Sequence, residues 1–540
     1  MSEAKRMATV TAAIESRTRT AAFWLAVSLL VFVPLVFSVG IRRIFCLPKF
    51  AILLVSSSAL VPLILLAARR RGELSRVLLA RHTVIVWLYL IVVAVSTIFG
   101  VAPVASLFGS FENQMGLITQ GCFFVCFLGL KVGIGASQAR LERALWAMAL
   151  TGLAAAVFAS LQFFGYDPFL PASVYTFNSA AGPVVRVTGT LGHSNYLGNF
   201  LLYTTPMSAG LALASRGRAR YLALAAAALA VAAIAFSGTR GAWVGLVVGL
   251  LTFAALQLSG GAVAGLWARR RQVWFKVGLG CIIVAVAIGI IGAHPASRNI
   301  LLRARSFVAE GMTGSGRTLL WRDAVRMAPD FALVGCGPEG FRKAFLAYKS
   351  EQLAQFAPQV NNESSHNAYL DAAISYGLPG AILYVAIIAS TLRLMFIARR
   401  RAASPGLRAM FTGLFSSLVA VSTHNLFIFD QIPTGLYFFA FAALGGVVAN
   451  LAGAEKDADE NHANSQTRDS PAPAHIKGTT TSNDAVRITA KARKGKRDGG
   501  RRSEAGRARW PDWVITVAGG ALVIIAAWYA VAVLRADADL

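Results

Sequence analysis

A histidine followed by an asparagine, His366-Asn367, is the feature of this sequence best suited to chemistry. Ser364 or Ser365 can cap a short helix over about 366–376, which places His366 at the start of that helix. Exposed backbone amides and the positive end of the helix dipole there favour a neutral imidazole and bind anions. His366 is therefore our candidate for a general base beside a phosphorylated substrate. For a lone histidine, a polar cap at a membrane surface would be the better interpretation.

Two arginines elsewhere in the chain could complete a site with this histidine. Arg240 lies in a tight turn between two apolar stretches. Arg317 lies in a segment with helical spacing, in which Leu320, Ala324 and Met327 share one face. A guanidinium group holds phosphate through two parallel hydrogen bonds, which suits it to the charge that develops on a departing pyrophosphate. Both arginines are therefore candidates for binding that group.

Each arginine also has a structural interpretation. Arg240 could cap the preceding helix by binding its last carbonyl groups. Arg317 could pair with Asp323 or Glu310 in a solvated ion pair that contributes little stability. We rank the functional interpretation first, because both arginines and His366 fall on the same expected membrane face although they come from separate regions of the sequence.

Other polar residues near these segments could support the site. Arg186, Glu363 and Asn367 could orient it, although each is more often a structural residue than a direct participant. His193 is expected to be a turn residue at the membrane interface rather than a catalytic group.

Other catalytic and metal-binding patterns are missing from the sequence. It contains no phosphate-binding loop, no His-Glu-x-x-His and no Gly-x-Ser-x-Gly. The five cysteines have no metal-ligand spacing, and Cys122 and Cys126 are expected to share one face of a membrane helix. We therefore expect neither a metal nor a cofactor.

The chain that must position these residues is too apolar for a soluble globular protein. Of its 540 residues, 56% are hydrophobic and 14% are charged. Apolar stretches of roughly the length of a membrane span, about 20 residues, lie near 21–41, 48–68, 83–99, 116–134, 144–164, 196–215, 220–236, 241–258, 276–292, 372–397, 407–428, 433–453 and 513–534. The sequence therefore predicts an all-α, polytopic transmembrane helical bundle of about 12 spans plus one extra C-terminal span.

Basic residues between the spans indicate the orientation. The net charge is +27, but the basic residues form short clusters between apolar runs, so we expect no nucleic-acid partner. With a cytoplasmic N-terminus, the clusters all lie on the cytoplasmic side, with Arg42-Arg43 as the exception. The segments 100–115, 165–195, 237–241, 293–371 and 429–432 then lie on the periplasmic side. We expect a multi-pass protein of the inner membrane, with its active site facing the periplasm.

The composition divides the chain into three parts. Residues 1–453 should form the transmembrane domain, in which 293–371 is a large periplasmic helical loop that contains the catalytic region. Residues 454–509 are rich in polar and charged residues and predict a disordered, basic cytoplasmic linker. Residues 510–540 should contain the additional transmembrane helix.

Four stretches together resemble the O-antigen ligase (Wzy_C) family. His366-Asn367, followed by Gly377 and Gly380, has the spacing of the family's His-Asn region. The turn at 236–241, the segment with Arg317 and Trp321, and residues 186–196 are similar to further stretches of the family. The resemblance covers roughly 20–450, whereas the linker and the last helix depart from the family's usual pattern.

This resemblance implies a metal-independent, inverting glycosyltransferase that acts at the periplasmic face. The donor would be a glycan linked to undecaprenyl pyrophosphate, and the acceptor a hydroxyl group of lipid A–core. His366 would be the base, and Arg240 and Arg317 would bind the pyrophosphate. Alternatives are a related O-antigen or exopolysaccharide polymerase, a protein O-oligosaccharyltransferase and, outside the enzymes, a polysaccharide exporter.

Overall fold

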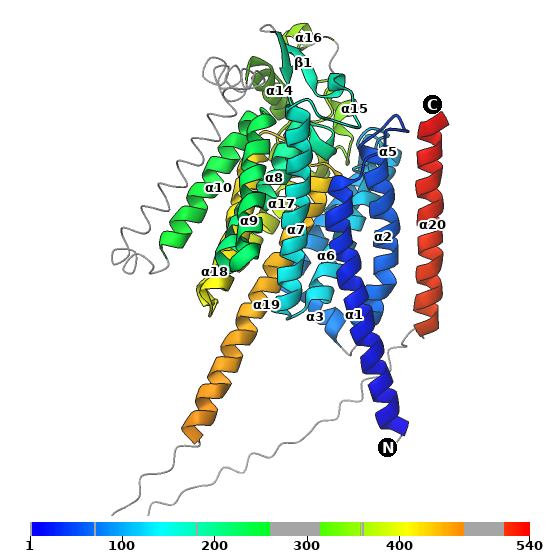
Figure 1. The fold of residues 1–540 in the computed structure, drawn as a ribbon. Helices are drawn as coiled ribbons and strands as arrows, with labels where there is room; N and C mark the ends of the chain where they lie inside the picture. Colours follow the sequence, from blue (N-terminus) through cyan, green and yellow to red (C-terminus); the bar gives the residue numbers. More distant parts are fainter. Residues whose placement is uncertain are drawn as a thin grey trace, which may run out of the picture.

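The computed structural model describes residues 3–69, 72–179, 182–259, 314–356, 358, 361–468 and 512–539. Within these ranges the chain is an all-α, polytopic helical bundle, as predicted (Figure 1). The long helices are α1 (Glu3–Leu35), α2 (Cys46–Ala67), α4 (Arg81–Phe99), α6 (Leu117–Ile134), α7 (Gln138–Phe163), α8 (Ser194–Ala214), α9 (Gly217–Phe236), α10 (Arg240–Leu258), α17 (Ala368–Arg401), α18 (Pro405–His424), α19 (Ile432–Arg468) and α20 (Asp512–Asp539).

Eleven helices in the described ranges are long and apolar enough to cross a membrane. Helix α8 is a further long helix of the bundle that is not among these eleven, and Ser, Thr and Asn residues interrupt its apolar sequence. It is largely buried and packs against α9 and α18. The span expected at 276–292 lies outside the described residues.

Short elements cover the end of the bundle that lies opposite the N-terminus (Figure 1). They include α5 (Pro103–Phe108), α14 (Gly314–Met327), α15 (Phe341–Phe345), α16 (Glu351–Phe356) and the antiparallel strands β1 (Thr176–Ser179) and β2 (Gly182–Val185). The two strands were not predicted. In α14, Leu320, Ala324 and Met327 are buried in a small apolar core, which confirms the predicted shared face.

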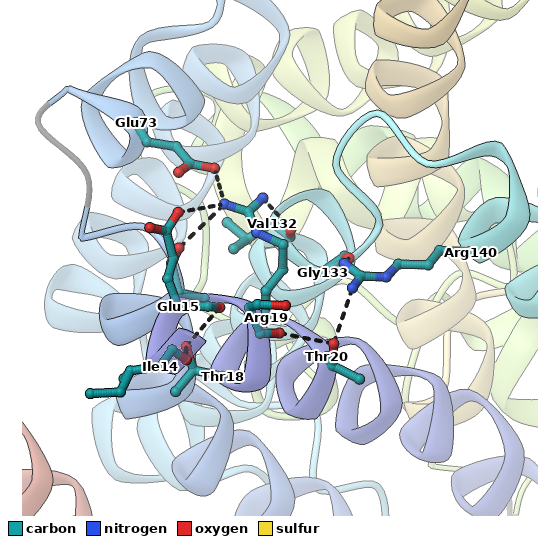
Figure 2. Close-up of polar contacts among 11 residues, drawn as sticks. Ile14, Glu15, Thr18, Arg19, Thr20, Glu73, Val132, Gly133 and Arg140 are labelled. Carbon is teal, nitrogen blue, oxygen red and sulfur yellow. Dashed lines mark hydrogen bonds and ion pairs between the residues drawn. The ribbon is translucent and has the colours of Figure 1, made fainter. Parts of the chain in front are cut away.

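A network of polar contacts joins helices at the N-terminal end of the bundle. Figure 2 shows Arg19 of α1 bound to Glu73 of α3 (Glu73–Leu79) at 2.6 Å and to the backbone carbonyl of Val132 in α6 at 3.2 Å. Arg140 of α7 donates to the carbonyl of Gly133 at 2.7 Å. Basic residues at this end therefore connect four helices, including the helix that contains the N-terminus.

Arg43, part of the exception to the charge pattern, lies between α1 and α2. Its guanidinium pairs with Glu112 at 3.1 Å. Glu112 also accepts a hydrogen bond from Arg342, so the charge of Arg43 belongs to a paired network in which a carboxylate offsets it.

The C-terminal region differs in part from the expected boundaries. Helix α19 continues to Arg468, into the segment for which a disordered linker was expected from residue 454, and 469–511 lie outside the described residues. The additional helix, α20, lies beside α2, where the rings of Tyr529 and Phe50 are 6.2 Å apart.

Candidate functional site

The helix that follows His366 begins two residues later than predicted. Helix α17 starts at Ala368 and its cap is Asn367, so the expected capping by Ser364 or Ser365 is wrong. The Asn367 side chain accepts hydrogen bonds from the backbone amides of Tyr369 at 3.1 Å and Leu370 at 3.2 Å. His366 therefore lies just before the cap, in a left-handed backbone conformation with φ 55°.

The expected end of this helix, at Gly377, is a kink within α17. Gly377 has φ 68°, and a Cβ there would lie 2.8 Å from the carbonyl oxygen of Ala332. The next amide, of Leu378, donates to the same carbonyl at 2.7 Å. Glycine is needed here because the backbone turns in the left-handed region while a second segment lies against it.

Replacing Asn367 by Ala should remove the cap of α17. We expect the free energy of unfolding to fall by about 1 kcal/mol, because two amides at the helix start lose their acceptor. Asn367→Ser should recover most of that loss, since serine also caps helices. Chemical denaturation of the full chain in detergent micelles measures both; equal destabilisation by Ala and Ser would contradict this role.

Helix α14 holds the segment that contains His366 from the other side. The indole nitrogen of Trp321 donates to the carbonyl of Ser365 at 2.8 Å. The amide of Ser365 donates to Asp371 Oδ1 at 2.7 Å, and the amide of His366 donates to Ser364 Oγ at 3.1 Å. The backbone around His366 is thus fixed by side chains from both α14 and α17.

Trp321→Phe should therefore weaken activity more than it weakens the fold. Loss of one hydrogen bond should cost about 1 kcal/mol of stability, and the looser placement of His366 should lower kcat by about tenfold. Trp243→Phe is the matched control, because that indole donates to the Ile234 carbonyl at 3.1 Å within another part of the bundle. Steady-state kinetics and thermal unfolding of both variants test this; equal kcat values would show that the Trp321 bond does not position the base.

Arg317 is a half-buried cation in α14 with an open guanidinium group. It makes no hydrogen bond or ion pair with any residue that the structure describes. Asp323, one of the partners considered from the sequence, instead accepts hydrogen bonds from the amide and hydroxyl of Ser350 and lies 3.4 Å from Arg322. Glu310, the other, lies outside the described residues.

The charges around Arg317 show which groups lie near it. Burial, and then the nearby Arg240 guanidinium, lower the pKa of Arg317. Burial, and then Arg317, lower the pKa of His366 to about 4. Arg317 thus lies within electrostatic reach of both other candidates, and the imidazole of His366 is neutral at ordinary pH. Its Nδ1 atom is buried and has no hydrogen-bond partner in the described part of the chain.

Arg240 is the first residue of α10, directly after the turn that ends α9. Glycines let α10 approach α18 closely: a Cβ on Gly241 would lie 2.9 Å from the His424 ring, and one on Gly245 would lie 2.6 Å from the Ala420 carbonyl. This close packing of small residues is typical of membrane helices and sets the start of α10, with Arg240, beside the end of α18.

Residues 225–385 match the family model described as O-antigen ligase, Wzy_C. This part of the chain is therefore similar to a Wzy_C domain, and we refer to it below as the Wzy_C domain. It includes Arg240, Arg317 and His366-Asn367, whereas Arg186 lies before it. No curated protein matches the chain. The matched region begins within α9 and ends within α17, so it contains Arg317 and the two candidates within its electrostatic reach, Arg240 and His366.

Asn195, which the sequence did not single out, links Arg186 to the Wzy_C domain. Its Oδ1 atom accepts from Arg186 at 3.1 Å and from the hydroxyl of Thr239, the residue before Arg240, also at 3.1 Å. The sequence indicated Asn195 only through its place in the stretch 186–196, which resembles the Wzy_C family. Arg186 is therefore linked through Asn195 to Thr239, and it could stabilise the turn that precedes Arg240.

His193 lies within electrostatic reach of Arg186, Arg317 and His366, but it has a structural function. Its Nδ1 atom accepts from the amide of Asn195 at 3.1 Å and so caps α8, in agreement with the expected turn residue. Burial, followed by Arg186, His366 and Arg317, lowers its pKa to about 4. We refer to the three arginines, Arg186, Arg240 and Arg317, together with the two neutral histidines among them, His193 and His366, as the cationic cluster.

Glu363 binds residues outside the cationic cluster. It pairs with Arg342 and accepts a hydrogen bond from the side-chain amide of Asn113 at 2.8 Å. It lines a cavity of about 140 Å³ whose wall also includes Phe429. The Phe429 ring lies 5.4 Å from the His366 ring, so this aromatic side chain contacts both the cavity and the candidate base.

Proposed function

We propose that the chain transfers a glycan from undecaprenyl pyrophosphate to a hydroxyl group of lipid A–core, as an O-antigen ligase-type enzyme. The Wzy_C domain indicates this general class of activity. The observation that supports the more specific proposal is the open, half-buried guanidinium of Arg317, which lies within electrostatic reach of both Arg240 and His366. Two neighbouring guanidinium groups suit an anion with several oxygens, such as pyrophosphate.

The proposed reaction is a single displacement with inversion. The acceptor oxygen attacks the anomeric carbon, while the bond from that carbon to the pyrophosphate oxygen breaks and its electron pair leaves with the pyrophosphate. The acceptor's proton passes to His366, which is neutral and able to accept it. Arg240 and Arg317 stabilise the charge that develops on the leaving group, so the proposed reaction needs no metal ion.

We infer that the site faces the periplasm of a cell with an inner membrane. The site lies at the end of the bundle opposite the N-terminus, on the side of α14 (Figure 1). The basic clusters favour a cytoplasmic N-terminus, which sets this end outward. A lipid-linked donor would then arrive already activated, in keeping with a site built around cations for its pyrophosphate.

The test is a reconstituted transfer reaction with three separate acceptors. The full chain in proteoliposomes receives a lipid-linked glycan in the presence of EDTA, with lipid A–core, a second lipid-linked glycan or an acceptor protein. We expect the product to be glycosylated lipid A–core, with inverted anomeric configuration. A longer lipid-linked glycan would identify a polymerase, glycosylated protein would identify an oligosaccharyltransferase, and no transfer to any acceptor would favour the exporter.

The lowered pKa of His366 predicts the pH dependence of this reaction. Protonation removes the base, so the rate should fall as pH falls through the pKa of the free enzyme. Because that pKa is about 4, kcat/KM should remain level through pH 6.5, where an ordinary histidine is half protonated. A pH-rate profile of the reconstituted enzyme measures this, with unfolding monitored separately. An acidic limb centred near pH 6.5 would contradict the proposed environment of His366.

A further inference from the structure

The cavity lined by Phe429 differs in charge from the cationic cluster. Its volume is about 140 Å³, and its lining includes four carboxyl groups, those of Glu339, Glu363, Asp371 and Asp430, and one guanidinium group, that of Arg342, which pairs with Glu363. Carboxyl groups outnumber the one cation in this lining, so the cavity is unfavourable for a pyrophosphate. A ligand of this cavity should be uncharged and should form many hydrogen bonds.

Polar groups in the cavity wall lack partners within the described chain. Gln120 of α6 is only 6% exposed, lines the cavity, and its side chain makes no hydrogen bond to any described residue. One oxygen of Asp371, Oδ2, and one of Asp430, Oδ1, are buried without a hydrogen-bond partner among those residues. Buried polar atoms are usually paired, so this convergence of an amide and two carboxyl groups indicates a ligand.

Aromatic rings complete the lining. Tyr376, Tyr384 and Phe429 face the cavity together with these polar groups. Hydroxyl groups can bond to amides and carboxylates, while the apolar faces of a sugar ring can pack against aromatic rings. A lining that offers both hydrogen-bonding groups and aromatic rings is suited to a saccharide. The chemistry therefore fits an uncharged sugar residue better than an ion or a lipid chain.

We propose that this cavity binds the terminal sugar of the acceptor, an inference that rests on the proposed glycosyl transfer. In an inverting displacement the attacking oxygen and the leaving group lie on opposite sides of the anomeric carbon. The cationic cluster would hold the pyrophosphate, and the cavity would hold the acceptor next to Phe429, which lines the cavity and contacts the His366 ring. Gln120 and Asp430 are assigned as residues that bind the acceptor.

The test compares the binding of three probes by the full chain in detergent micelles. The probes are core oligosaccharide freed of lipid A, the glycan released from the donor, and inorganic pyrophosphate; thermal unfolding reports the apparent Kd of each. The variants are Gln120→Met, which keeps the side-chain size, and Asp430→Asn. Tyr203→Phe is the matched control, because the Tyr203 hydroxyl is also buried without a partner in the described residues but lies outside the cavity lining.

We expect the apparent Kd for core oligosaccharide to rise by about tenfold in Gln120→Met and Asp430→Asn, as expected for a lost ligand contact, and to stay unchanged in Tyr203→Phe. The Kd for pyrophosphate should not change in any of the three variants. Wild-type affinity for core oligosaccharide in both cavity variants, or a response of the wild type to donor glycan alone, would overturn the proposal. Absence of pyrophosphate binding with intact oligosaccharide binding would refute the donor site instead.

Discussion

Replacing His366 by Asn is expected to lower kcat by two to four orders of magnitude, about the contribution of a general base. Asparagine tolerates the left-handed backbone at this position better than Ala does, so the local structure should survive while the proton acceptor is lost. The glycan should accumulate on undecaprenyl pyrophosphate. Transfer from labelled donor to lipid A–core, measured in proteoliposomes, gives both quantities.

His193 provides a matched control for this substitution. Both histidines are buried in the cationic cluster, and the pKa of each is lowered to about 4. Asparagine is a good helix cap, so His193→Asn should preserve the start of α8 and most of the activity. If His193→Asn abolished transfer and His366→Asn did not, the two histidines would have been assigned the wrong functions.

Replacing Arg317 or Arg240 by Lys is expected to impair transfer strongly although the charge is kept. Lysine cannot form the two parallel hydrogen bonds of a guanidinium, and a lost bond to a charged group costs about 1.5–3 kcal/mol, or a decrease in kcat/KM of about 10- to 100-fold. The KM for the donor and the rate of the chemical step should both suffer. Single-turnover measurements with lipid-linked glycan separate them.

Arg326→Lys is the control for these variants. Arg326 lies in α14 like Arg317, but its side chain is 63% exposed and its contact with Asp323 is long, at 3.9 Å. Near-normal activity of Arg326→Lys together with impaired Arg317→Lys would separate phosphate binding from a general effect on α14. Normal activity of both Arg240→Lys and Arg317→Lys would favour structural functions for the two arginines.

The membrane-spanning helices could be predicted because an apolar run of sufficient length has few alternatives in a bilayer. That the site faces the periplasm is a prediction from the basic clusters. The hairpin of β1 and β2 could not be predicted, since its strands have only four residues each and show no long alternating pattern. The extension of α19 to Arg468 was likewise hidden by a polar composition typical of linkers.

Within the site, local sequence gave the residue types but not their contacts. Ser364, Ser365 and Asn367 are all good caps, and the hydrogen bonds of Ser365 to Trp321 and Asp371 leave Asn367 to cap α17. The bond between Trp321 and Ser365 joins residues 44 positions apart in the sequence. The cavity could not be predicted for the same reason, because its lining comes from helices and loops far apart along the chain.

The central claim is that pyrophosphate binds beside both Arg317 and His366, and the pKa of His366 reports on it directly. NMR titration of histidine-labelled protein in micelles, with the signal assigned through His366→Asn, measures that pKa with and without inorganic pyrophosphate. We predict a pKa of about 4 in the free protein, rising towards the ordinary value when the anion offsets the charge of Arg317. A pKa that stays the same on saturation with pyrophosphate would contradict a shared site.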